Sequence, residues 1–150
     1  MSDETLKAPW SSMRNDVHLP RLEDLVTRVR AQPHAAKQTF VARTSWQRGT
    51  RTMAVFTEMH LDGENQSPPA RRSAIEMDEP LYIGGADDAP NPGEVLLAAL
   101  AGCVTAGTAI TAATSGVHLD KLELELEADL DLRGFMSIDP SVPSGITDIR

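Results

Sequence analysis

The residue with the clearest capacity for chemistry is Cys103, the only cysteine in the 150-residue chain. It lies inside an uncharged run rich in Ala, Gly and Thr, which begins after Asn91-Pro92-Gly93-Glu94. A thiolate attacks electrophiles such as peroxides, whereas a neutral buried thiol acts only as a small apolar side chain. The residue types alone favour the packing role and leave the chemical one open.

A long helix is predicted to carry this cysteine. Asn91 is a good N-cap, Pro92 suits the first helical position, and Glu94 can reach back to close a capping box. Charged residues are absent from 95–115, and Gly116 is a natural left-handed terminator. The pattern predicts about two dozen helical residues, roughly 36 Å at 1.5 Å per residue.

The absence of charge predicts that the helix is buried on most sides. A transmembrane span is the competing interpretation, but repeated threonines make the run only weakly apolar, and it has neither an aromatic belt nor basic flanks. These threonines are Thr105, Thr108, Thr111 and Thr114. Small residues between them allow another backbone to approach closely. We therefore expect a buried interface helix and no membrane partner.

Cys103 falls on a defined stripe of this helix. The stripe also holds Leu96, Leu100, Gly107 and Ile110. Glu94 lies on roughly the opposite side and some 13 Å along the axis, so it cannot touch Cys103 in a straight helix.

Composition restricts the classes of function. The chain has 14 Lys and Arg against 22 Asp and Glu, a formal net charge of −8, and 41% hydrophobic residues. These values suit one soluble domain with a core and argue against nucleic acid or an anionic membrane as partner. With no secretory signal and no possible disulfide within the chain, a cytoplasmic location is expected. The scattered histidines predict no metal site.

Ahead of the long helix we expect a flexible arm over residues 1–18, and then a single domain over 19–150. Its first elements are a short amphipathic helix over Leu22–Val29 and two strands, 40–46 and 51–61, joined by a turn. A third strand is predicted over Arg72–Asp78.

After the helix, leucines alternate with acidic residues from Leu122 to Leu132. This period of two predicts a strand with one buried and one solvated face. Residues 146–150 begin another alternating segment. An unpaired edge there would need a partner chain or a longer natural protein to cover it.

The stretch from Ala89 to Cys103, APNPGEVLLAALAGC, resembles the signature of the OsmC/Ohr family of osmotically inducible and organic-hydroperoxide-resistance proteins. The resemblance extends over roughly residues 39–150, and the segments 130–135 and 139–142 resemble one bacterial subgroup. It implies an α+β fold with antiparallel sheets around a long buried central helix. It also implies an interwoven dimer with active sites at the interface, and it implies that the C-terminal part of the family fold is absent here.

The resemblance further implies thiol-dependent reduction of organic hydroperoxides, with Cys103 as the attacking thiolate. The family's activating arginine corresponds to Arg48, with Arg51 as the alternative. The family's glutamate falls at Gly93, so Glu94 is only a neighbouring candidate. The family's second cysteine is not in this chain, so an external thiol would have to regenerate the enzyme.

Three functions remain open at this point. The first is a hydroperoxide reductase without a cofactor, whose apolar substrate lies in a pocket lined by Leu96, Leu100 and Ile110. The second is a non-enzymatic dimer that binds a small apolar ligand in the same pocket. The third is a structural domain with no ligand. An arginine close to the Cys103 sulfur would favour the first, because an apolar setting alone favours the neutral thiol.

Overall fold

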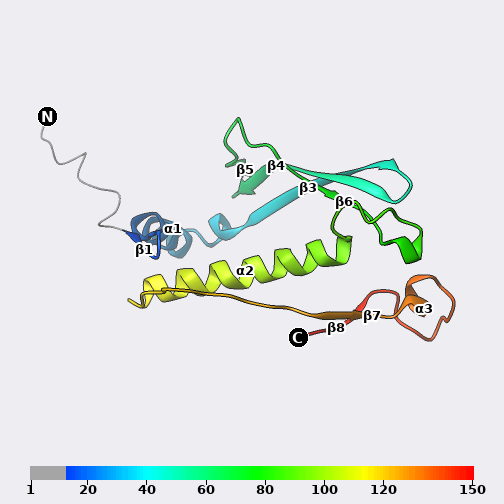
Figure 1. The fold of residues 1–150 in the computed structure, drawn as a ribbon. Coiled ribbons are helices and arrows are strands. Elements are labelled where there is room, and N and C mark those ends of the chain that lie inside the picture. Colours follow the sequence, from blue (N-terminus) through cyan, green and yellow to red (C-terminus); the bar gives the residue numbers. More distant parts are fainter. Residues whose placement is uncertain (1–12) are drawn as a thin grey trace, which may run out of the picture.

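The computed structural model describes residues 13–150 as a mixed α+β chain with antiparallel sheets and one long helix. Figure 1 shows the long helix α2 (Pro92–Thr114) between a sheet on one side and a returning extended segment on the other. The fold class is therefore α+β, as the sequence predicts.

The larger sheet is built on a long hairpin. Strands β3 (Gln38–Arg48) and β4 (Arg51–Leu61) pair antiparallel, with bulges in the register, and both strands were predicted. β6 (Ser73–Met77) and the short β5 (Glu64–Asn65) pair with the other edge of β4. The third strand is thus also confirmed.

The predicted start of α2 is confirmed. The Asn91 side chain accepts a hydrogen bond from the Gly93 N–H at 2.7 Å, and the Asn91 N–H donates to Glu94 Oε2 at 2.8 Å. These two bonds complete the capping box. At the other end Gly116 has φ 81°, the left-handed conformation expected of a helix terminator.

A small N-terminal hairpin holds the far end of α2. It consists of β1 (Met13–Arg14) and β2 (Val17–His18), and the predicted amphipathic helix follows it as α1 (Leu19–Ala31). The Asn15 side chain donates to the Val117 carbonyl and accepts from the Leu119 N–H, both at 3.0 Å.

The arm expected over residues 1–18 is therefore ordered in its last part. Residues 13–18 belong to the hairpin, because side-chain hydrogen bonds tie them to the end of α2. The rest of the predicted arm lies outside the described residues. After α1, a 3₁₀ turn, η1 (Pro33–Ala36), leads into β3, and a second, η2 (Leu81–Ile83), interrupts the loop before α2.

The strand expected over Leu122–Leu132 forms only in part. Residues 117–126 are extended but belong to no ladder. Glu127 exchanges two backbone hydrogen bonds with Arg150, and β7 (Ala128–Leu130) then pairs with β8 (Ile146–Ile149). A one-turn helix, α3 (Leu132–Phe135), follows β7. Alternating side chains favour an extended backbone, but a strand also needs a neighbour for its N–H and C=O groups.

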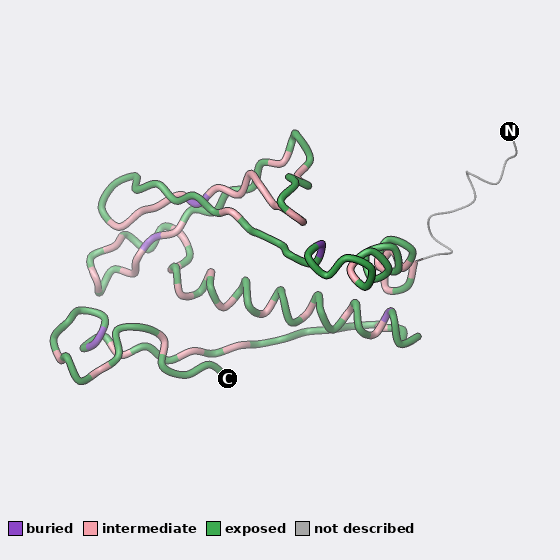
Figure 2. Tube along the Cα trace, turned by 180° about the vertical axis from the view of Figure 1, so that it is seen from behind, coloured by how far each residue is buried: buried purple, intermediate pink, exposed green. Residues whose placement is uncertain are grey.

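The expected apolar core is not found within one chain. Figure 2 shows how few of the described positions are buried. Among residues 13–150 the buried apolar side chains are only Ala35, Ala54 and Ala113. Helix α2, expected to be buried on most sides, is exposed over much of its length. The composition of α2 predicts that the helix packs against an apolar neighbour, but it does not show that the same chain supplies this neighbour.

Candidate functional site

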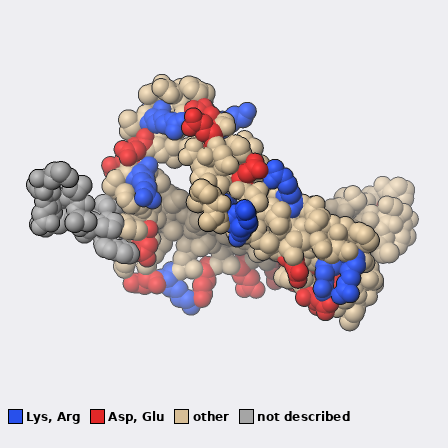
Figure 3. All heavy atoms as spheres, turned by 90° about the horizontal axis from the view of Figure 1, so that it is seen from above, with Lys and Arg blue, Asp and Glu red and all other residues tan. Residues whose placement is uncertain are grey.

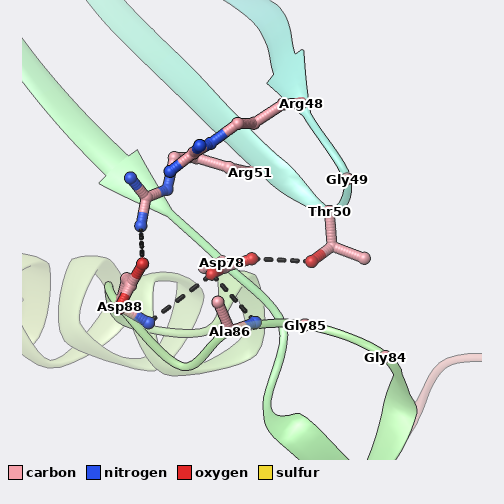
Figure 4. A pocket seen from close by; sticks show the side chains of 9 residues that line it. All are labelled: Arg48, Gly49, Thr50, Arg51, Asp78, Gly84, Gly85, Ala86 and Asp88. Atoms are coloured by element: carbon pink, nitrogen blue, oxygen red, sulfur yellow. Dashed lines mark hydrogen bonds and ion pairs between the residues drawn. The ribbon is translucent and has the colours of Figure 1, made fainter.

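A cavity lies where the β3–β4 turn meets the loop leading to α2, and Figure 4 shows it from close by. Its volume is about 390 Å³. One wall is the turn 48–51, which carries Arg48 and Arg51, and the other consists of Asp78, Gly84–Ala86 and Asp88. The predicted Arg48 therefore lies in a formed cavity, together with its alternative Arg51.

The carboxylate of Asp78 connects the two walls of this cavity through hydrogen bonds. It is 2% exposed and is the buried charged residue of the described chain. Its carboxylate accepts hydrogen bonds from Thr50 Oγ1 at 2.6 Å, the Glu79 N–H at 2.9 Å and the Ala86 N–H at 3.2 Å. The Thr50 hydroxyl, opposed by burial and helped by the backbone donors, holds the pKa of the Asp78 carboxyl below its ordinary value.

The two arginines of the cavity differ in their partners. Arg51 forms an ion pair with Asp88, across the junction between turn and loop, and its side chain is 21% exposed. Arg48 makes no ion pair with a described residue. Of the two, Arg48 has the guanidinium that remains available to a ligand or to a second chain.

Glu94, the predicted catalytic carboxylate, has a structural task in this chain. Its Oε2 atom receives the Asn91 N–H at the start of α2. The Asn91 amide in turn donates to Glu79 Oε2, which ties the helix start to the beginning of the loop between β6 and α2. No bond between Glu94 and Cys103 is found within residues 13–150.

Cys103 is exposed on α2 and does not line the cavity. No hydrogen bond or ion pair from residues 13–150 reaches its thiol. The predicted pocket residues Leu96, Leu100 and Ile110 share its helix and are 55%, 38% and 39% exposed. Within one chain they therefore form an open surface, and the expectation of an enclosed pocket and of a packed interface around Cys103 is not met by this chain alone.

A second, shallower cavity lies on the C-terminal half of α2, with a volume of about 490 Å³. It is lined by Val104, Gly107, Thr108, Thr111, Ala112, Ser115 and Val117. The hydroxyls of Thr108 and Thr111 bond back to carbonyls of the preceding turn, both at 2.9 Å. The polar groups of these threonines are thus satisfied inside the helix, so this face behaves as an apolar surface.

Within residues 13–150, no group of three or more His, Cys, Asp or Glu side chains is placed to hold a metal ion. Helix α2 is long and apolar enough to cross a membrane, a test that core helices of soluble proteins also pass. Basic and acidic side chains are interspersed on the face that Figure 3 shows.

Sequence reasoning missed Asp78, Thr50 and Asp88. The nearest signal was Asp78 itself, at the end of a predicted strand and just ahead of a loop with Gly84-Gly85. Its partner Thr50 lies 28 residues away, and local spacing cannot reveal such a contact.

Comparison with known proteins agrees with the resemblance noted in the sequence. The family model described as OsmC-like protein matches residues 85–150. The matched stretch starts in the cavity loop and contains the capping box, Cys103 and all that follows. A comparison with curated proteins found no match. Residues 85–150 of the chain are therefore similar to the OsmC-like proteins.

Proposed function

We propose that this chain forms a homodimer that reduces organic hydroperoxides, with Cys103 as the attacking thiolate. The observation that carries the proposal is the position of the OsmC-like cysteine. It lies on an uncharged helix face that its own chain leaves open, beside Leu96, Leu100 and Val104. Such a face suits an apolar substrate once a second surface closes over it.

The amount of exposed surface supports the dimer. The chain has an accessible surface of 11357 Å², whereas a compact monomer of its 16.2 kDa mass exposes about 7,500 Å². The excess stays above roughly 2,000 Å² even if residues 1–12 are counted as a fully extended chain. An obligate dimer typically buries about 1,000–2,500 Å² on each partner. The excess surface is therefore of the size that a second copy would cover.

The proposed reaction needs no cofactor. The Cys103 thiolate attacks the outer oxygen of the hydroperoxide, so an S–O bond forms and the O–O bond breaks. The alkoxide leaves and takes up a proton to become an alcohol, and Cys103 becomes a sulfenic acid. One external thiol displaces water to give a mixed disulfide, and a second releases Cys103 with formation of the external disulfide.

The thiolate needs a cation beside it, and we assign this role to Arg48. Its guanidinium lines the cavity at the β3–β4 turn and has no ion-pair partner among residues 13–150. Because that cavity does not include Cys103, the approach of arginine and sulfur has to come from dimer assembly.

The test is turnover of cumene hydroperoxide by the wild type with a small dithiol as reductant. Cys103→Ser should abolish turnover and leave the dimer folded. In the control Cys103→Ser/Ala99→Cys the only thiol lies one turn earlier on the same exposed face. We expect that variant to react with alkylating reagents but not to turn over. Apolar hydroperoxides should react faster than hydrogen peroxide.

The second candidate function is binding of a small apolar ligand without catalysis. The open cavity lined by Val104, Gly107 and their neighbours favours it. A wild-type protein that forms no sulfenic acid with cumene hydroperoxide, yet binds an apolar fluorescent probe in that cavity, would support this alternative and reject the reductase.

A further inference from the structure

The junction between the β3–β4 turn and the loop before α2 depends on a single carboxylate. Asp78 immediately follows β6, and its side chain receives Thr50 from the turn, and Ala86 and Asp88 from the loop. The distances are 2.6 Å, 3.2 Å and 3.5 Å respectively. One buried side chain therefore holds together segments that are far apart in the sequence.

The same junction carries the arginines. Thr50 stands between Arg48 and Arg51 in the chain, so the bond from Thr50 to Asp78 fixes the turn that bears both guanidinium groups. Arg51 then reaches Asp88, whose own N–H points to Asp78. The turn that carries both arginines and the Asp88 partner of Arg51 are thus each bonded to Asp78.

The loop side of the junction leads directly into the helix that carries Cys103. The Asp78 N–H donates to the Pro90 carbonyl at 3.2 Å, one residue before the N-cap Asn91. The loop is tightly packed at Gly85, because a Cβ there would lie 1.6 Å from the Glu79 carbonyl oxygen. A shift of the turn therefore cannot be absorbed easily by the loop.

We propose that Asp78 is a positioning residue for the thiol chemistry, holding the turn with Arg48 and Arg51 in a fixed place relative to the start of α2. This inference rests on the proposed reductase function. Asp78 itself touches neither Cys103 nor the substrate. Its carboxylate acts through Thr50 on the turn that carries the arginines, while its backbone N–H bonds to Pro90 just before the helix.

The test replaces the carboxylate by an amide. Asp78→Asn keeps the size but turns an NH₂ group toward at least one of the present donors. Misplacement of a reacting group by about 1 Å can cost around 100-fold in rate. We expect kcat/KM for cumene hydroperoxide to fall by about that factor, and the alkylation of Cys103 by iodoacetamide at neutral pH to slow.

The matched control is Asp139→Asn. Asp139 also accepts a serine hydroxyl at 2.6 Å and a backbone N–H at 2.9 Å, both from Ser141, but it lies in the loop after α3. We expect this variant to lose stability without slowing turnover or alkylation.

A second pair of variants serves if Asp78→Asn does not fold. Thr50→Val removes the hydroxyl at nearly constant shape and should slow both reactions, whereas Thr50→Ser keeps the hydrogen bond and should restore them.

The outcomes separate the two proposals. An active wild type in which Asp78→Asn and Thr50→Val react as fast as Asp139→Asn overturns the positioning role and leaves the reductase function standing. A wild type without turnover overturns the reductase function and the positioning role with it.

Discussion

The two sides of the proposed site differ in how completely a single chain packs them: the β3–β4 turn is tightly packed, whereas the Cys103 face of α2 is exposed. At the β3–β4 turn, the buried Asp78 has its donors in place and Gly85 has no room for a side chain. On α2, the Cys103 face is exposed, and a Cβ at Gly102 or Gly107 would meet open space. The polar side is complete, whereas the apolar side needs a second surface. In the proposed dimer, the partner copy would cover this face of α2.

The largest expected effect comes from a charge on the open face. Leu100 is 38% exposed in the single chain, and in a dimer Leu100→Glu would bury an unpaired carboxylate. Such a change costs about 3–5 kcal/mol, enough to dissociate a dimer at micromolar concentration. Light scattering should show a dimer for the wild type and a monomer for the variant.

Gln66→Glu is the control for added charge, because Gln66 lies in the exposed loop beyond β5. It should remain dimeric. A wild type that is monomeric, or a Leu100→Glu protein that dimerises as well as the control, would contradict the assignment of the α2 face to a partner copy.

The packing of the side formed by the turn and the loop can be tested at Gly85, where a side chain has the least room. Gly85→Ala places a Cβ against the Glu79 carbonyl, so the loop has to move, and overpacking of this kind costs about 3 kcal/mol. Urea denaturation measures the loss. In the control Gly145→Ala the new Cβ meets open space, so its midpoint should stay close to that of the wild type. Equal midpoints for the two variants would show that the loop is looser than the structure indicates.

Local rules predicted the elements but not the junction between them. The capping box at Asn91 and Glu94, and the hairpin over 38–61, depend on residues close together in the chain, and both were confirmed. The bond from Thr50 to Asp78 joins residues 28 positions apart, so no spacing rule could find it. That bond joins Asp78 to the turn that carries Arg48 and Arg51.

The burial of α2 shows a different limit of sequence reasoning. An uncharged run indicates that a helix requires an apolar neighbour, but it does not say which chain provides one. The same holds for residues 122–126, whose alternating side chains predict a strand that finds no ladder among the described residues. For both segments, the sequence predicts a neighbour that one chain does not supply: an apolar surface for α2 and a pairing strand for the extended segment.

The smallest expected effect concerns Glu94, which lies between the two sides. Its carboxylate accepts the Asn91 N–H, so Glu94→Ala should lower the free energy of unfolding by about 1 kcal/mol through loss of the capping box. Glu94→Gln keeps an acceptor oxygen at the same place and should be nearly as stable as the wild type. If Glu94 is structural, both variants should alkylate Cys103 and turn over cumene hydroperoxide at wild-type rates, measured where each is fully folded. A Glu94→Gln protein with wild-type stability but slow thiol chemistry would instead assign Glu94 the family's catalytic role, and would require the start of α2 to come nearer to Cys103 of a second copy than it does within one chain.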